Sequence, residues 1–385
     1  MKYWRGFLVA GIFAAITWAL TEFAKAHSVL VDMIYPYMAR LISMTLTQWS
    51  SGMSACLWQV LLVVLVLIGI GTIVLMIRFK WNVVQWVGWV TAVVSFIVML
   101  NVGLFGLNRY ASPLADDMRL KISDFTVSEL SEATVYYRDQ ANVLAAELER
   151  DSKGNPKYES FEAMAEQALQ GFYTLSREDA ISVFAGAEYP VKKLGFGFLY
   201  GKNFGATCAI TGEAAVNTSV PDVILPFAMC NETCHKLSIY SEADAAFGAF
   251  LACIRNEDKA FQYAGYLMAY RYCYLALQNI PTSTAQSAAN TTDKGVSRLL
   301  REDLEKVDKF LGKKTAAPND RAEIPADAAA EDAPIHFSEY DDVSDLLACW
   351  YIEKFITPLH QEEETTFNPL DPNQVDLSGL VNARK

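Results

Sequence analysis

Three residues near the middle of the chain have the spacing of a zinc-protease motif. Residues 226–247 read PFAMCNETCHKLSIYSEADAAF and contain Asn231, Glu232 and His235. Positions four apart on a helix share a face, so a histidine at position 231 would complete His-Glu-x-x-His. In that motif two imidazoles hold one zinc and the glutamate handles the attacking water. An amide oxygen is a poor zinc ligand, and Glu-x-x-His alone is common in ordinary helices.

Two cysteines in the same stretch offer an alternative set of metal ligands. Cys230 and Cys234 are also four apart, but their face of the helix is rotated by about 100° from that of Asn231 and His235. A Cys-Cys-His site would therefore need a distorted helix. Six of the seven cysteines lie after residue 108, which permits disulfides, while the alternative is that they are buried thiols.

The charged residues divide the chain into two unlike parts. Of 32 Lys/Arg and 44 Asp/Glu, residues 1–108 hold only six and two, which leaves 26 basic and 42 acidic residues after them. An apolar front and an acidic remainder indicate a membrane anchor followed by a water-soluble domain. The acidity argues against binding of nucleic acid, which requires a basic face.

Three charge-free apolar runs predict three transmembrane helices within an anchor at residues 1–108. They cover residues 6–20, 55–77 and 83–107, and the last two exceed the roughly 20 residues that a bilayer requires. The first could also be a cleaved signal peptide. Three spans would place four basic residues on the same side of the membrane: Lys2, Arg5, Arg78 and Lys80. The positive-inside rule assigns that side to the cytoplasm. Residues 27–54 and everything after about residue 107 are then outside.

The remaining residues predict a mainly helical domain at 109–312. Helical spacing and capping signals predict helices at 126–150, 160–173, 226–237, 242–254, 261–280, 296–311 and 340–356. Residues 196–216 are expected to be extended or to form a hairpin. Within them, Glu213 could be a turn or capping carboxylate, or lie beside a substrate. Residues 313–334 indicate a flexible acidic Ala/Pro-rich insertion, and 335–385 a C-terminal helical segment and tail.

Several sequence blocks in order resemble the bacterial membrane-protein family known as domain of unknown function 3810. They are FGLNRYASPL at 105–114, TGEAAVN at 211–217, the stretch 226–253 and YAGYL at 263–267. The family pattern around the third block is Pro-Phe-Thr-x-Cys-His-Glu-x-Ala-His. The resemblance implies a mainly α protein in which three membrane helices precede an extracytoplasmic zincin-like α+β domain.

The resemblance also implies a role for each position of the motif. The family's first zinc histidine falls on Asn231, its catalytic glutamate on Glu232 and its second histidine on His235. Its acidic pair falls on Glu242 and Asp244. One of these acids would supply the third ligand, and Glu242 is the better candidate because it keeps its identity.

Departures from the pattern predict that catalysis is impaired. Asn231 removes a ligand, Ser238 replaces a glycine that permits a sharp turn, and Ala246 replaces an asparagine. We expect zinc to bind weakly or not at all, and a pseudo-metalloprotease that contacts membrane lipid and a polypeptide or cell-envelope partner. An active zinc hydrolase with a non-standard ligand set and a purely structural membrane protein remain the alternatives. The expected location is the bacterial cytoplasmic membrane, with the C-terminal domain outside.

Overall fold

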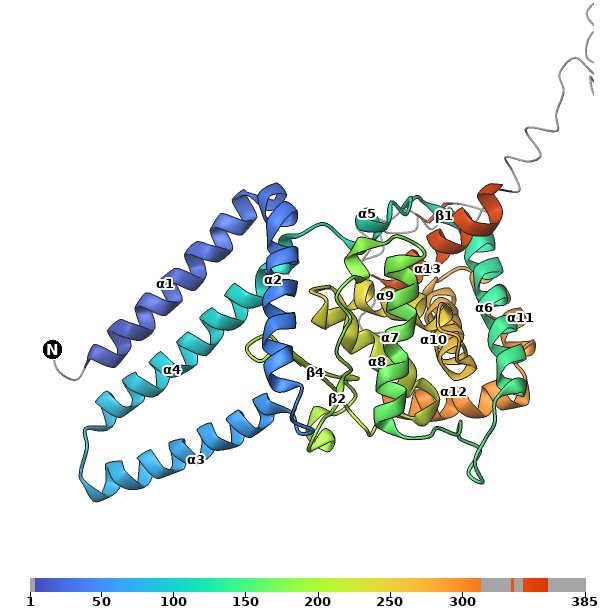
Figure 1. The fold of residues 1–385 in the computed structure, drawn as a ribbon. Helices are drawn as coiled ribbons and strands as arrows, with labels where there is room; N and C mark the ends of the chain where they lie inside the picture. Colours follow the sequence, from blue (N-terminus) through green and yellow to red (C-terminus); the bar gives the residue numbers. More distant parts are fainter. Residues whose placement is uncertain (1–3, 313–333, 336–341, 359–385) are drawn as a thin grey trace, which may run out of the picture.

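The computed structural model describes residues 4–312, 334–335 and 342–358 of the chain. It consists of long apolar helices at the N-terminus and a helical domain that contains the rest (Figure 1). Nearly all of the insertion expected at residues 313–334, and most of the expected C-terminal tail, lie outside the described residues.

Four N-terminal helices are long and apolar enough to cross a membrane, one more than the sequence predicts. They are α1 (Arg5–Ala26), α2 (Ser28–Ser50), α3 (Leu57–Arg78) and α4 (Val83–Leu104). The additional helix is α2, which occupies the region expected to be an outer connection. Asp32, Pro36 and Arg40 interrupt its apolar residues, so its mean hydropathy is only 1.3, compared with 3.2 for α3.

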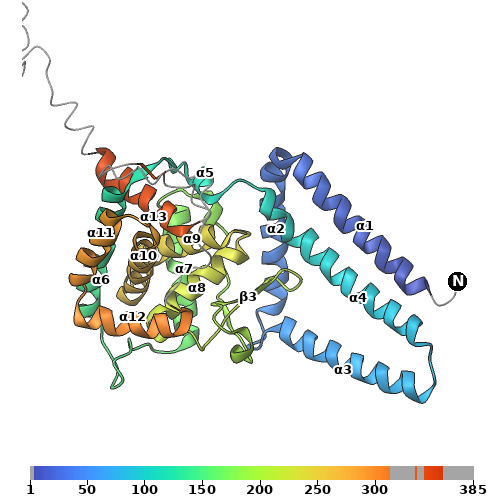
Figure 2. The same cartoon turned by 180° about the vertical axis from the view of Figure 1, so that it is seen from behind.

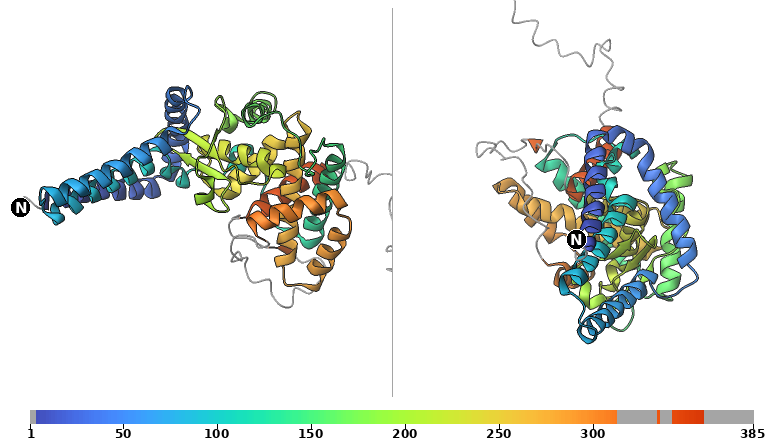
Figure 3. Two further views of the ribbon diagram at one scale, coloured as in Figure 1. Left: turned by 90° about the horizontal axis from the view of Figure 1, so that it is seen from below. Right: turned by 90° about the vertical axis from the view of Figure 1, so that its left-hand side faces the viewer.

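The four apolar helices are not arranged alike. Helices α1, α3 and α4 project away from the domain, whereas α2 crosses their base and lies against the domain (Figures 1, 2 and 3). Helices α1 and α4 pack along each other and run in the same direction. Gly6 and Gly88 allow this close approach, because a Cβ atom on Gly6 would lie 2.4 Å from the Gly88 carbonyl carbon.

Helix α2 joins the apolar helices to the domain. The Arg40 guanidinium donates to the carbonyl oxygens of Leu237 and Ser182, at 3.3 and 3.2 Å. Further along the helix, the Thr47 hydroxyl donates to the carbonyl oxygen of Gly212. These contacts involve one face of α2. Other positions of α2 leave large apolar side chains exposed, including Val29, Met33, Met38, Leu41 and Trp49.

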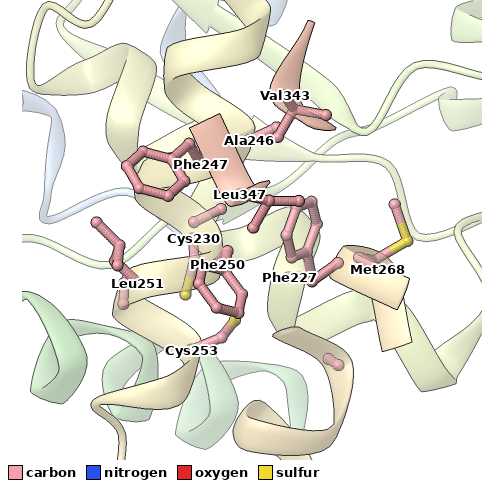
Figure 4. Close-up of a cluster of buried hydrophobic side chains, with 14 of the residues drawn as sticks. Phe227, Cys230, Ala246, Phe247, Phe250, Leu251, Cys253, Met268, Val343 and Leu347 are labelled. Atoms are coloured by element: carbon pink, nitrogen blue, oxygen red, sulfur yellow. The ribbon is translucent and has the colours of Figure 1, made fainter. Parts of the chain in front are cut away.

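The domain packs its helices around one apolar core. Its helices are α5 (Leu114–Met118), α6 (Val127–Glu147), α7 (Phe161–Arg177), α8 (Leu225–Lys236), α9 (Glu242–Ile254), α10 (Lys259–Asn279), α11 (Ser283–Lys294), α12 (Arg298–Leu311) and α13 (Val343–Tyr351), which continues as a π-helix at Ile352–Ile356. Figure 4 shows Phe227 of α8, Phe247 and Phe250 of α9, Met268 of α10 and Leu347 of α13 gathered in this core.

Short strands complete the domain. The strands β2 (Lys192–Lys193), β3 (Gly205–Cys208) and β4 (Glu213–Val216) form a sheet in the order β2-β4-β3. Strands β3 and β4 are antiparallel, which confirms the hairpin predicted within residues 196–216. Strand β4 is central and buried, so β3 is an edge strand. Two further strands, β1 (Phe125–Thr126) and β5 (Pro334–Ile335), pair with each other.

Most predicted helices are confirmed, with bounds that differ by a few residues. The capping box predicted before α6 is present, since the Thr126 hydroxyl accepts from the Glu129 backbone and the Glu129 carboxylate accepts from Thr126. Helix α11 was not predicted, because its sequence, STAQSAANTTDK, buries only small side chains. The cysteines are free thiols and most are buried, which agrees with the second of the two alternatives.

Candidate functional site

The Asn-Glu-x-x-His sequence lies on α8, at the centre of the domain. Pro226 occupies the first turn of this helix, where its missing N–H costs no hydrogen bond. Every residue of α8 is buried, between α9, α10, α7 and the β3–β4 hairpin. Asn231 and His235 are one helical turn apart and share a face, as the spacing predicts.

A sharp turn after α8 returns the chain to His235. Ser238 has a φ of 74°, the left-handed conformation in which the family pattern has a glycine. The Ser241 hydroxyl then caps α9 by accepting from the Asp244 backbone. Glu242, the first residue of α9, places Oε1 at 3.4 Å from Nε2 of His235. The serine therefore preserves the sharp turn, and Glu242 reaches His235.

His235 and Glu242 form an ion pair that is open on one side. The Nδ1 atom of His235 lies 3.0 Å from the carbonyl oxygen of Ile239, so this nitrogen carries a proton and donates. Burial opposes a charge on the ring, but the hydrogen bond to Glu242 and the nearby carboxylates of Glu232 and Glu242 raise the pKa of His235 above its usual value. Glu242 itself is 85% exposed, so solvent reaches the pair from its side.

Asn231 takes part in the same cluster as a hydrogen-bond donor. The hydrogen bond from His235 and the one from the Asn231 amide both lower the pKa of Glu242. The Oδ1 atom of Asn231 is buried and has no hydrogen-bond partner in the part of the chain that the structure describes. This acceptor lies at the position that a first histidine would occupy in a His-Glu-x-x-His motif.

Glu232 faces a different neighbour, the edge strand β3. Its Oε2 accepts from the Thr207 hydroxyl at 3.1 Å, and its side chain packs so closely on Gly205 that a Cβ there would lie 2.8 Å from the Glu232 carboxyl carbon. Burial raises the pKa of Glu232 to about 7. A general base needs a pKa near the working pH, but it must also reach its substrate, and here β3 covers the carboxylate.

Asp244 does not join His235. It lies two residues further along α9, about half a helical turn, and its carboxylate points towards Leu114 and the acidic residues of α5. Burial raises its pKa to about 6. Of the two acids considered for a third ligand, the structure brings only Glu242 to the histidine.

Glu213 caps the N-terminus of the apolar helix α3, and capping is one of the two roles that the sequence left open. Its carboxylate accepts from the backbone N–H groups of Leu57 and Trp58, at 3.0 and 3.1 Å, at the N-terminus of α3. It also pairs with Lys192, at 2.6 Å between Oε1 and Nζ. The negative charge meets the positive end of the helix dipole and fixes α3 to the sheet.

Sequence reasoning missed a buried lysine beside the histidine. Lys236 is only 4% exposed, donates to the carbonyl oxygen of Tyr189 at 2.8 Å and lies over the Tyr189 ring. Burial lowers its pKa to about 7. No pattern in the sequence indicates this burial, because an isolated lysine at the end of a helix is ordinarily solvated.

The residues of this cluster fit a zinc ion poorly. A hydrolytic zinc site has three protein ligands and an open position for water. His235 and Glu242 supply two donors, and the amide of Asn231 is a weak third. Among the residues that the structure describes, no three His, Cys, Asp or Glu side chains are placed to hold a metal ion.

The fold and the site define a protein with helices apolar enough to span a membrane and a helical domain built around a buried Asn-Glu-x-x-His helix. Residues 31–321 match the family described as protein of unknown function (DUF3810), and the chain belongs to that family. The family resemblance read from the sequence is thereby confirmed. No curated protein and no solved structure matches the chain.

Proposed function

We propose that this protein is a membrane-anchored, zincin-like pseudo-metalloprotease that binds a polypeptide without cleaving it. The observation that carries the proposal is the His235–Glu242 contact of 3.4 Å on the face that Asn231 completes. Nε2 of His235 and the Glu242 carboxylate would be metal ligands in a zinc enzyme. Here a proton held between them takes the place of the metal, and the Asn231 amide adds a second donor to the same carboxylate.

The position of Glu232 supports the loss of catalysis. In a zinc protease this glutamate takes a proton from the attacking water. Its carboxylate in this chain accepts from the Thr207 hydroxyl and packs against Gly205, so it is not free to take a proton from water. Peptide hydrolysis would require a carboxylate that reaches the attacking water.

The edge strand supports the binding of a polypeptide. Within the described residues, strand β3 pairs with β4 on one side only, and an extended peptide can add to the other edge of such a strand through backbone hydrogen bonds. Thr207 links this strand to Glu232, so a peptide on β3 would lie beside the degenerate motif.

The helix directions support the proposed placement in a bacterial cytoplasmic membrane. Helices α1 and α4 point in the same direction (Figure 1). If both span the membrane, the part of the chain between them must cross it an odd number of times. Helix α3 provides one crossing, and α2 then lies along the surface. Arg5 and Arg78 lie at the ends of α1 and α3 that are far from the domain. The positive-inside rule assigns those ends to the cytoplasm and the domain to the outside.

The metal content of the purified full-length protein tests the proposal. We expect the natural protein to hold far less than one zinc per chain and to cleave no member of a general peptide library. Asn231→His should raise the content towards about one zinc per chain, because the helix already directs that side chain to the site. Asn231→Leu, which adds no ligand, is the matched control. Stoichiometric zinc in the natural protein that is lost in His235→Ala would establish the active-hydrolase alternative instead.

A further inference from the structure

A pocket of about 850 Å³ lies between the membrane helices and the domain. Its walls come from α2, from the turn that follows α4 and from the α8–α9 turn. This volume is within the roughly 300–1,000 Å³ of ordinary ligand sites. Helix α4 ends at Leu104, and the first residue after it that lines the pocket is Asn108. The pocket is therefore at the level where a membrane span would leave the bilayer.

Two buried side chains in the pocket wall have unsatisfied polar atoms. Asn108 is 5% exposed, and among the described residues neither its amide nitrogen nor its oxygen has a hydrogen-bond partner. Asp244 is 7% exposed, and its Oδ1 is unpaired. Buried polar groups are nearly always hydrogen-bonded, and leaving one unpaired costs about 1–3 kcal/mol. These atoms offer a ligand one donor and two acceptors.

The remaining polar residues of the pocket carry both charges. Arg40 and Arg109 supply guanidinium groups, and Arg40 donates two N–H groups to described residues, Leu237 and Ser182. Asp32 and Asp117 join Asp244 to give three carboxylates. A ligand that carries one anionic and one cationic group would match these residues.

The approach to the pocket is apolar. Met33 and Tyr37 of α2 line it and are 66% and 57% exposed, and Tyr240 on the domain side is 41% exposed. The apolar face of α2 continues from them towards its N-terminus with Val29 and Leu30. Tyrosines beside an apolar helix face are typical of the membrane interface, where acyl chains meet headgroups.

We propose that this pocket binds the headgroup of a phospholipid that carries a primary amine, such as phosphatidylethanolamine. The phosphate contacts Arg109, Arg40 and the amide nitrogen of Asn108. The ammonium group contacts Asp244, Asp117 and the Asn108 oxygen, and the acyl chains lie on the exposed face of α2. The site is separate from the His235–Glu242 pair and does not depend on whether the protein binds zinc.

Lipid retention by the full-length protein in a non-ionic detergent tests this assignment. Native mass spectrometry would compare phosphatidylethanolamine, phosphatidylcholine and phosphatidylglycerol with identical acyl chains. We expect phosphatidylethanolamine to bind about tenfold more tightly than phosphatidylcholine, because trimethylation removes every N–H donor of the headgroup. Asn108→Leu should abolish this preference. Asp117→Asn, a change at an exposed side chain that leaves the core intact, should reduce it.

Asp116→Asn is the matched control, since Asp116 is exposed beside Asp117 but does not line the pocket. It should leave the preference unchanged. Equal retention of the three lipids, or a preference that survives Asp117→Asn, would overturn the proposal and indicate unspecific lipid around the apolar helices. Competition by free phosphoethanolamine as strong as that by the lipid would overturn the assignment to a membrane ligand.

Discussion

We expect the Lys192–Glu213 ion pair to contribute strongly to the stability of the contact between the apolar helices and the domain. The Glu213 side chain is 1% exposed and that of Lys192 is 13% exposed. Glu213 also accepts from Leu57 and Trp58, and Lys192 donates to the Ser50 carbonyl oxygen at the end of α2. Glu213→Gln would leave a buried ammonium group without its counter-charge and remove a charge from the N-terminus of α3.

Breaking a buried ion pair on one side costs about 3–5 kcal/mol. For a domain of this size, that corresponds to a fall of about 6–20 °C in the midpoint of thermal unfolding. The neighbouring Lys193–Glu162 pair is the control, because its side chains are 51% and 69% exposed. Glu162→Gln should cost at most about 1 kcal/mol. The measurement is thermal unfolding of the full-length protein in detergent. Equal effects of the two substitutions would refute the reasoning.

Three further substitutions test other parts of the structure. Ser238→Gly should raise the free energy of unfolding by about 1 kcal/mol, since the φ of 74° strains serine but not glycine; an unfolding midpoint that falls would contradict this. Glu232→Gln should stabilise the protein by up to about 3 kcal/mol at pH 8 and little at pH 4.5. The reason is that the pKa of Glu232 rises from 4.5 to about 7 on folding, so the penalty for its ionisation grows between these values. Unfolding midpoints measured across that pH range would check this, and equal stabilisation at both ends would refute it. Gly6→Leu should separate α1 from α4 and lower the unfolding midpoint, whereas Gly11→Leu, with open space around it, should not.

Local sequence patterns predicted most of the helices, because caps and apolar periodicity act within a few residues of the chain. The capping box at Thr126 and the bounds of α9 are examples. The same reasoning failed for α2. Its apolar residues are interrupted by Asp32 and Arg40, and only packing against the domain explains why Arg40 can be buried there.

At the candidate site, too, some features follow from local sequence and others only from the tertiary structure. The spacing of Asn231, Glu232 and His235 fixed which of them share a face of α8, because a helix has a regular repeat. Which acid would meet the histidine depended on the path of the turn at Ser238, and the structure brings Glu242 to His235 while Asp244 faces elsewhere.

The sequence by itself determined that this chain has an apolar anchor, a mainly helical acidic domain and a motif without its first histidine. These follow from composition and from spacings along one helix. Only the tertiary structure decided that Glu213 caps the apolar helix α3, that β3 covers Glu232 and that Asn108 and Asp244 line one pocket. Each of these contacts joins residues far apart in the chain, and the packing of separate elements, which no local pattern encodes, brings them together.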